Sequence, residues 1–302
     1  MNRVKEYIVV DVGGTEIKSC LIDELGEKKS EILKTPSKAK CSREEIMDNF
    51  YWIIRTIAGE SHGNIQGIAF AFPGEFDYER GISLLKNLDK YDAIYQVNVR
   101  ETIREWICGS SIQNQFQNPK DMPIVFVNDV EGFAVGAAWN RRKAIAIVIG
   151  TGAGSAFIKN GQPAPKGEDG VPENGAIYDA PFRGKRIDDW ISKRGIMELS
   201  KTFTGRAMEG AELAKCVEKG DPKAVAAYQQ FGRLLKEAVE PYLVKFRPDV
   251  CILGGQIMNS FSFFGDILVK MCEELKIEIQ VITKTSETTF NGLYRILIEE
   301  RT

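Results

Sequence analysis

Two glycine-rich turns carry the clearest chemical signal in the sequence, and each follows a run rich in β-branched residues. The first turn is Gly13-Gly14-Thr15, after the run 8–12, and the second spans 150–154, after the run 145–149. Glycines let a backbone turn tightly and approach a ligand closely, and the N–H groups of such turns bind phosphate. Each turn also precedes another short apolar run. We therefore interpret the pair as an internal repeat whose two half-sites could hold a polyphosphate between two domains.

The remaining segments alternate between strand-like and helix-like patterns, which predicts an α/β fold. Ser42 is the expected N-cap of one helix, and Asp221-Pro222 is a typical start of another. The polar segment 109–121 indicates a domain boundary. The spacing predicts further strands at 68–72, 124–127, 250–253 and 277–282, and helices at 43–58, 99–107, 128–139, 261–275 and 290–297.

Composition excludes several classes of protein. The chain has 302 residues, of which 43% are hydrophobic, enough for two domains with substantial cores. A formal net charge of -2 gives no electrostatic case for nucleic acid or membrane as the main partner. No apolar run reaches the length of a membrane span, and none before Asp11 resembles a signal peptide, so we expect a cytoplasmic protein.

Cysteine and histidine usage excludes further chemistry. The six cysteines lie far apart with no Cys-x-x-Cys pair, so neither a zinc site nor a disulfide framework is expected. His62 is the only histidine and lies in the polar segment 59–64, where a surface position is expected. A Ser-His-Asp enzyme would depend on that one residue. The first turn also lacks the Gly-x-Gly-x-x-Gly spacing of dinucleotide-binding proteins.

Four short segments stand in order along the chain: Asp11–Lys18, Asn128-Asp129, Gly150–Ser155 and Leu253-Gly254-Gly255. They resemble the first phosphate motif, the catalytic dipeptide, the second phosphate motif and the adenosine motif of the ROK family of sugar kinases, within the superfold shared with actin and heat-shock chaperones. The resemblance implies two ribonuclease-H-like α/β domains with mixed central sheets, and an interdomain cleft in which nucleotide and sugar meet. We expect domains at 1–122 and 123–302, with the last helix able to pack back on the first domain.

The same resemblance implies ATP as donor and Mg²⁺ as cofactor. Asp11 would hold Mg²⁺, directly or through water, because a carboxylate at a strand end suits that ion. Lys18 would face either the phosphates or solvent. The residues expected to contact the nucleotide are Gly13, Gly14 and Thr15 in the first motif, Gly150, Thr151, Gly152, Ala153 and Gly154 in the second, and Gly254 and Gly255 in the third.

Asp129 is the expected general base, since phosphoryl transfer needs a carboxylate that accepts the proton of the attacking hydroxyl. A helix N-cap is the structural alternative for Asn128 or Asp129, and the two roles are compatible. By resemblance, the residues that bind the sugar are Asn87, Asn128, Asp129 and Glu173.

One departure from the family pattern concerns Ala176, which stands where many ROK kinases have histidine. The downstream cysteine cluster that binds zinc is also absent, so no zinc site is expected. The insert 177–195 is aromatic and charged instead, and it could form an acceptor pocket or a solvated loop with a helix start.

The leading prediction is ATP- and Mg²⁺-dependent phosphorylation of a hydroxyl of a hexose or hexose derivative. One alternative is a kinase that uses polyphosphate, because the segments 150–158 and 72–74 resemble that group. Another is a non-catalytic sugar-binding or sensing protein of the same fold. Family members are often homodimers, and the apolar residues of the helix from Asp221 suit either a partner or a core.

Overall fold

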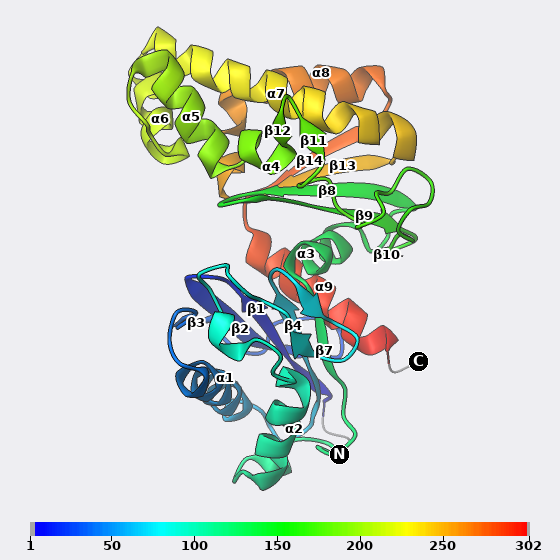
Figure 1. Cartoon of the computed structure of the whole chain (residues 1–302). Coiled ribbons are helices and arrows are strands. Elements are labelled where there is room, and N and C mark those ends of the chain that lie inside the picture. Colours follow the sequence, from blue (N-terminus) through cyan, green and yellow to red (C-terminus); the bar gives the residue numbers. More distant parts are fainter. Residues whose placement is uncertain (1–3, 301–302) are drawn as a thin grey trace. The chain divides into compact units, whose positions relative to one another are not determined.

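The computed structural model describes residues 4–300, which divide into two compact units. The first unit contains the residues up to Gly136 together with those from Ser286 onward, and the second contains Ala137–Thr285. Each unit has a five-stranded mixed sheet (Figure 1), as the α/β prediction requires. No helix in this part of the chain is long and apolar enough to cross a membrane.

The first unit is built on a sheet of order β3-β2-β1-β4-β7, in which β2 is antiparallel to its neighbours and β1, β4 and β7 are parallel. Its strands are β1 Glu6–Val12, β2 Glu16–Asp23, β3 Leu33–Pro36, β4 Ile65–Phe72 and β7 Ile124–Asn128, with a small hairpin of β5 Phe76–Asp77 and β6 Ile82–Ser83. Its helices are α1 Arg43–Ala58, α2 Val99–Gly109, α3 Asp129–Ala138 and α9 Thr285–Glu299, with 3₁₀ turns at Asp92–Ile94 and Gln113–Gln115.

Both faces of this sheet are covered, which explains the nearly continuous apolar sequence of its central strands. Ile8 and Val10 of β1 point to the core that includes α1 and α2, whereas Val9 points to the core that includes Leu293 of α9. The last helix thus packs on the first unit, on the opposite face of the sheet from α1 (Figure 1). Ser42 caps α1 through a capping box with Glu45, which confirms the predicted start of that helix.

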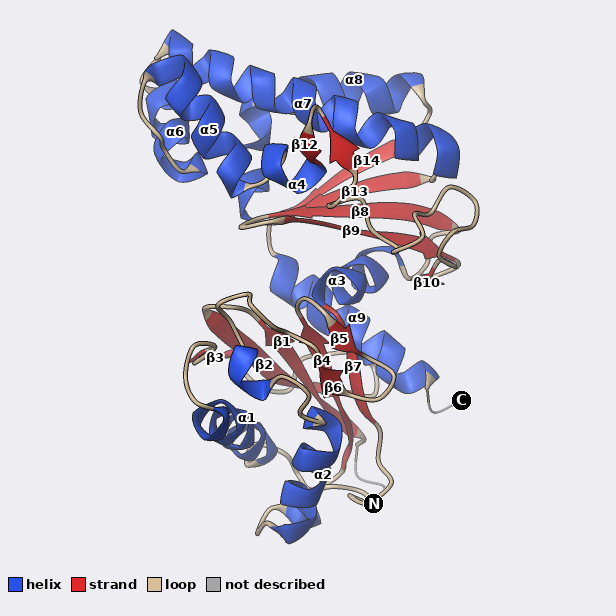
Figure 2. Cartoon of the chain, viewed as in Figure 1, coloured by secondary structure: helices blue, strands red, loops and turns tan. Residues whose placement is uncertain are grey.

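The second unit repeats this strand order, β10-β9-β8-β13-β14, which confirms the internal repeat. Its strands are β8 Lys143–Ile149, β9 Ala153–Lys159, β10 Gln162–Pro163, β13 Val250–Gly254 and β14 Glu278–Ile282, with a hairpin of β11 Pro181–Phe182 and β12 Lys185–Arg186. Its helices are α4 Ile187–Trp190, α5 Lys193–Thr204, α6 Gly210–Glu218, α7 Pro222–Phe246 and α8 Asp266–Glu274 (Figure 2), with a 3₁₀ helix at Gln256–Phe263. Asp221 caps α7 as predicted.

Several bounds differ from the sequence prediction, and the last helix, for example, begins at Thr285 instead of residue 290. The first unit runs through Gly136 instead of ending at 122, because β7 pairs with β4 and so belongs to the first sheet. The single helix expected at 261–275 is a 3₁₀ helix followed by α8. Gly265 separates the two, and a Cβ there would come within 2.4 Å of the Phe261 ring.

Helices α3 and α9 contact each other backbone to backbone through glycines. A Cβ at Gly292 would lie 1.8 Å from the carbonyl oxygen of Gly132, and one at Gly136 would lie 1.9 Å from that of Thr288. No side chain fits at these distances, so the two helices can approach this closely only with glycine at the contact.

We therefore expect Gly292→Ala to lower the free energy of unfolding by ~3 kcal/mol or more, because the helices must separate to admit the methyl group. Urea denaturation of the whole protein measures this. Gly109→Ala is the matched control, since nothing lies within 4 Å of a Cβ there at the end of α2. The control should be neutral or slightly stabilising. Equal stability of the two variants would contradict the tight contact.

Candidate active site

Two carboxylates meet at one edge of the first sheet. Asp11 lies near the end of β1 and Asp129 directly follows β7, and both strands run parallel to β4. Burial, followed by the charge of Asp129, raises the pKa of Asp11 from 3.8 to about 6. Burial also raises the pKa of Asp129. The hydrogen bond from the Val130 amide and the charge of Lys90 lower that pKa, but they offset the effect of burial only in part. Residues far apart in the sequence thus form one acidic pair.

Lys18 is the register partner of Asp11 across the β1–β2 hairpin. Its ammonium donates a hydrogen bond to Oγ of Ser286 (2.9 Å), and the Ser286 side chain also bonds Asp11. The charge of Lys18 acts against the burial of Asp11 and lowers its pKa. The sequence left phosphate and solvent as alternatives for Lys18, and the structure shows the ammonium bonded to Ser286 beside Asp11.

The Asn128 side chain caps the N-terminus of α3, and the hydrogen bonds of the cap hold that side chain in one orientation. Its Oδ1 accepts hydrogen bonds from the amides of Val130 (3.0 Å) and Glu131 (3.4 Å). Oδ1 of Asp129 also accepts from the Val130 amide, at 3.0 Å. The capping role predicted for either residue is therefore shared by both, with Asn128 making the longer-range contact expected of an N-cap.

Tyr78 holds the other end of the Asn128 side chain. Nδ2 of Asn128 donates to the Tyr78 hydroxyl at 3.2 Å. The single proton of that hydroxyl is shared between two carbonyl oxygens, that of Gly74 in the Pro-Gly turn at 2.9 Å and that of Phe72 at the end of β4 at 3.0 Å. The amide is thus held between the first turn of α3 and the end of β4.

The first phosphate motif forms a tight turn with two unoccupied amides. A Cβ at Gly13 would lie 2.6 Å from the carbonyl oxygen of Glu16, so the turn itself requires glycine there. Tyr91 donates from its hydroxyl to the carbonyl oxygen of Gly13 at 2.8 Å. Within residues 4–300, the amides of Gly14 and Thr15 have no acceptor. They are available to an anion.

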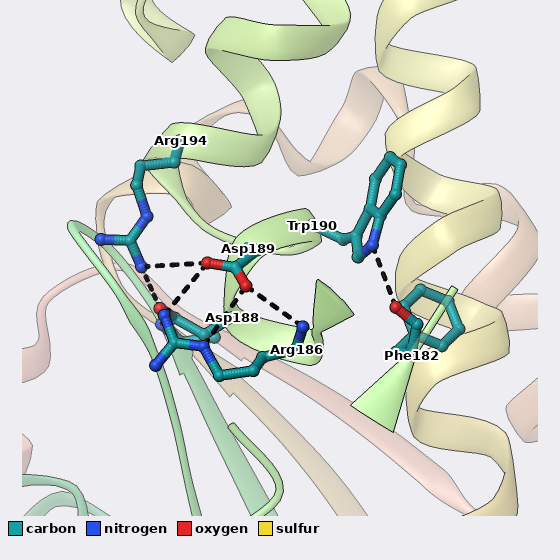
Figure 3. A network of polar contacts seen from close by, with 7 residues as sticks. Phe182, Arg186, Asp188, Asp189, Trp190 and Arg194 are labelled. Atoms are coloured by element: carbon teal, nitrogen blue, oxygen red, sulfur yellow. Dashed lines mark hydrogen bonds and ion pairs between the residues drawn. The ribbon is translucent and has the colours of Figure 1, made fainter. Parts of the chain in front are cut away.

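The second phosphate motif is fastened from within its own unit. The Gly150 amide donates to the carbonyl oxygen of Gly152 at 2.8 Å. The Ala153 amide donates to Oδ1 of Asp188 at 2.7 Å, and Asp188 also pairs with Arg194 (Figure 3). The Ala153 amide is therefore already bonded to a carboxylate, and contact of Ala153 with the nucleotide stays a prediction.

The insert 177–195 contains a small hairpin and the helix α4, and its contribution to an acceptor pocket stays a prediction. Its first residue, Ile177, is buried, whereas Tyr178 is exposed at 40% of its full area. Ile187, Asp188 and Ile191 are buried, and the exposed Arg186 pairs with Asp189 (Figure 3). The insert therefore anchors the second phosphate motif through α4, a role that the sequence did not indicate.

The adenosine motif lies at the same sheet edge as the second phosphate motif, since β13 runs parallel to β8 with Gly254 paired to Val148. Gly255 adopts a φ of 97°, and a Cβ there would lie 2.3 Å from the carbonyl oxygen of Ile149. The backbone itself thus requires glycine at this position. Because Gly255 lies against Ile149, the adenosine motif is next to the strand end that precedes the second phosphate motif.

The two remaining candidate residues for sugar binding, Asn87 and Glu173, lie in exposed segments. Asn87 is exposed in the first unit, in a loop where it adopts a φ of 61°. Glu173 is exposed in the second unit, and its Oε2 would lie 2.8 Å from a Cβ at Gly167. Their contact with a sugar stays a prediction.

Comparison with known proteins decides the family. The family model described as "ROK family" matches residues 7–291, nearly the whole chain. The chain belongs to the ROK family. An N-acetyl-D-glucosamine kinase of Haemophilus influenzae (strain 86-028NP) is 23% identical over 292 residues, covering 87% of this chain and 88% of the relative.

Solved ROK structures share the fold. A ROK hexokinase from Thermus thermophilus superposes with a TM-score of 0.77 at 16% identity, covering 98% of this chain and all of that one. A ROK family glucokinase from Streptomyces griseus, solved with glucose and AMPPNP, gives a TM-score of 0.68 at 20% identity. It covers 97% of this chain and 99% of that one.

Sequence reasoning missed several residues of this ROK protein that support the site. Their partners are distant in the chain and belong to no local motif, so residue spacing held no signal for them. They are Tyr78, Lys90 and Tyr91 in the loops before α2, Ser286 at the start of α9, and Asp188 in α4.

Asp188→Ala is expected to loosen the second phosphate turn, because it leaves the buried Ala153 amide without an acceptor, at a cost of ~1–3 kcal/mol. Amide hydrogen exchange at 150–154 should accelerate at least ~10-fold. Asp188→Asn keeps an acceptor oxygen and serves as the matched control. Unchanged protection in the alanine variant would show that Asp188 does not hold the turn.

Asp11→Asn is expected to stabilise the protein at pH 8, because it removes the cost of ionising a carboxyl whose pKa is raised to about 6. The folded state binds that proton more tightly, so wild-type stability falls as pH rises from about 4 through about 6. The advantage of the variant should grow over this interval to ~1–3 kcal/mol and then level off.

Thermal unfolding at pH 5 to 8 measures the difference between Asp11→Asn and wild type. Asp48→Asn, a change of an exposed carboxylate on α1, should show no such pH-dependent gain. A constant difference for Asp11→Asn across this range would contradict the raised pKa of Asp11.

Proposed function

We propose that this protein is a sugar kinase that transfers the terminal phosphoryl group of Mg·ATP to a hydroxyl of a hexose or hexose derivative. The observation that carries the proposal is the meeting of Asp11 and Asp129 at one sheet edge, beside the unoccupied amides of Gly14 and Thr15. Phosphoryl transfer needs these parts together: a metal-binding carboxylate, a proton-accepting carboxylate and donors to phosphate oxygens.

Asp129 acts as the general base in this proposal. It accepts the proton of the attacking hydroxyl as the new oxygen–phosphorus bond forms and the bond to ADP breaks. Asn128 orients the same sugar, since its amide is held by Tyr78 and by the first turn of α3. A fixed amide and carboxylate side by side bind hydroxyls in defined directions.

The residues fit Mg²⁺, which is commonly held by one or two carboxylates together with substrate phosphates and waters. Asp11 supplies a hard oxygen ligand, and the repulsion from Asp129 that raises its pKa would be relieved by a cation. Within residues 4–300 no group of three or more His, Cys, Asp or Glu could hold a metal alone, so phosphate oxygens would complete the site. When bound, the ion neutralises charge on the phosphates.

The comparisons support the choice of substrates. The relative from Haemophilus influenzae is named for N-acetyl-D-glucosamine, and the Streptomyces griseus glucokinase was solved with glucose and an ATP analogue. We therefore place glucose and N-acetyl-hexosamines first among the acceptors and ATP first among the donors. Polyphosphate remains the alternative donor, and Glu173 and Asn87 remain the proposed further contacts to the sugar.

Release of ADP from Mg·ATP across a panel of hexoses and N-acetyl-hexosamines tests the proposal. Wild type should turn over at least one sugar, and Asp129→Asn should lower kcat by ~10²-fold or more, since it removes the proton acceptor. Asp48→Asn is the matched control for the loss of a carboxylate and should keep full activity.

The alternatives give different results in the same assay. Turnover only with polyphosphate would show that polyphosphate, and not ATP, is the phosphoryl donor. Sugar binding measured by calorimetry without turnover from either donor would favour the non-catalytic sugar-binding protein. Near-normal kcat in Asp129→Asn would remove the proposed role of that residue.

A further inference from the structure

The loop 87–91 places Lys90 next to a residue that is anchored on the first phosphate turn. Tyr91 is fully buried, its amide donates to the carbonyl oxygen of Ala39 at 2.6 Å, and its hydroxyl donates to that of Gly13. On the other side, the exposed carboxylate of Asp89 pairs with the exposed Lys40, a contact that restrains the loop little. The backbone at Lys90 is therefore held mainly through Tyr91, directly against the first phosphate turn.

This loop also stores backbone strain. Asn87, Asp89 and Tyr91 have φ values of 61°, 56° and 60°, in the left-handed region that residues other than glycine rarely adopt. Such strain persists only where the surroundings impose it, and it gathers at functional sites. Of the two neighbours of Lys90, Tyr91 is the one strained by this conformation, because asparagine and aspartate adopt it more readily than a bulky residue does.

The Lys90 side chain lies on the phosphate turn with its charge uncommitted. It is partly buried, and a Cβ at Gly14 would lie 3.5 Å from its Cδ. Within residues 4–300 its ammonium makes no hydrogen bond and no ion pair within 4.0 Å. The same charge nevertheless acts on Asp129. The ammonium therefore lies near both the turn and the base, yet contacts no carboxylate directly.

Other lysines near this loop are engaged. Lys86 stacks on the ring of Tyr95 at 5.1 Å, Lys40 pairs with Asp89, and Lys18 bonds Ser286. Lys90 differs from all three, because its ammonium contacts no counter-ion although its charge acts on the half-buried Asp129. That position suits an anion that arrives with a substrate.

We propose that the Lys90 ammonium binds the phosphoryl group in transit between donor and sugar, and stabilises the charge on its equatorial oxygens. This inference rests on the proposed function. The sugar oxygen–phosphorus bond forms, the bond to ADP breaks and the hydroxyl proton goes to Asp129, while Lys90 stays protonated throughout. A preorganised charge at this point acts on the transition state more than on the bound sugar.

Steady-state kinetics of Lys90→Met, Lys90→Arg and the control Lys86→Met test the inference. Lys90→Met should lower kcat by about 10- to 100-fold, with the KM for sugar within about threefold of wild type. Lys90→Arg keeps the charge and should retain kcat within about fivefold, and Lys86→Met should match wild type. Calorimetric sugar binding by Lys90→Met would show that its site is folded.

Three results would overturn the role of Lys90 while leaving the kinase itself established. They are an unchanged kcat in Lys90→Met, an equal loss in Lys90→Arg and Lys90→Met, and a loss confined to the KM for sugar. Wild-type protein that phosphorylates no sugar from any donor would instead overturn the proposed function, and this inference with it.

Discussion

The candidate site depends on the burial of two carboxylates, Asp11 and Asp129, at one end of the first sheet, and burial is the largest cause of the raised pKa of each. Folding brings two carboxylates to one sheet edge, where burial and mutual charge raise the pKa of Asp11. Two half-buried carboxylates without a cation in direct contact lower the stability of a protein, so stability alone does not explain why both are present. The surrounding contacts relieve the repulsion only in part: Lys18 and Ser286 act on Asp11, and the Val130 amide and Lys90 act on Asp129.

Four glycines of the phosphate and adenosine motifs fall into two physical classes. Gly13 and Gly255 are required by the fold, because a Cβ at either would collide with a backbone carbonyl oxygen. Gly14 would meet only the flexible side chain of Lys90, and Gly150 would meet nothing within 4 Å. The fold makes no demand for glycine at these two positions. In the proposed function these two glycines would let phosphate approach the backbone closely, since no Cβ stands in the way.

Supporting residues hold the chemical groups from outside the motifs. Tyr78 fixes Asn128, Tyr91 fixes the first turn, and Asp188 fixes the second. Each support is a hydrogen bond to a backbone or amide group that would otherwise be free to rotate or to bind water. Such bonds restrict the geometry of a site before a ligand arrives, which is the condition for electrostatic stabilisation of a transition state.

The sequence by itself determined the α/β class, the capped starts of α1 and α7, the internal repeat and the order of the motifs. These follow from local periodicity, capping and turn chemistry, which act over a few residues. The tertiary structure decided the pairing of β7 with β4, which moved the unit boundary to Gly136, and it decided the meeting of Asp11 with Asp129. It also placed Asp188 on the Ala153 amide and Lys90 on the first turn. These contacts join segments far apart in the chain, and no local pattern encodes a partner that only strand pairing and packing bring near.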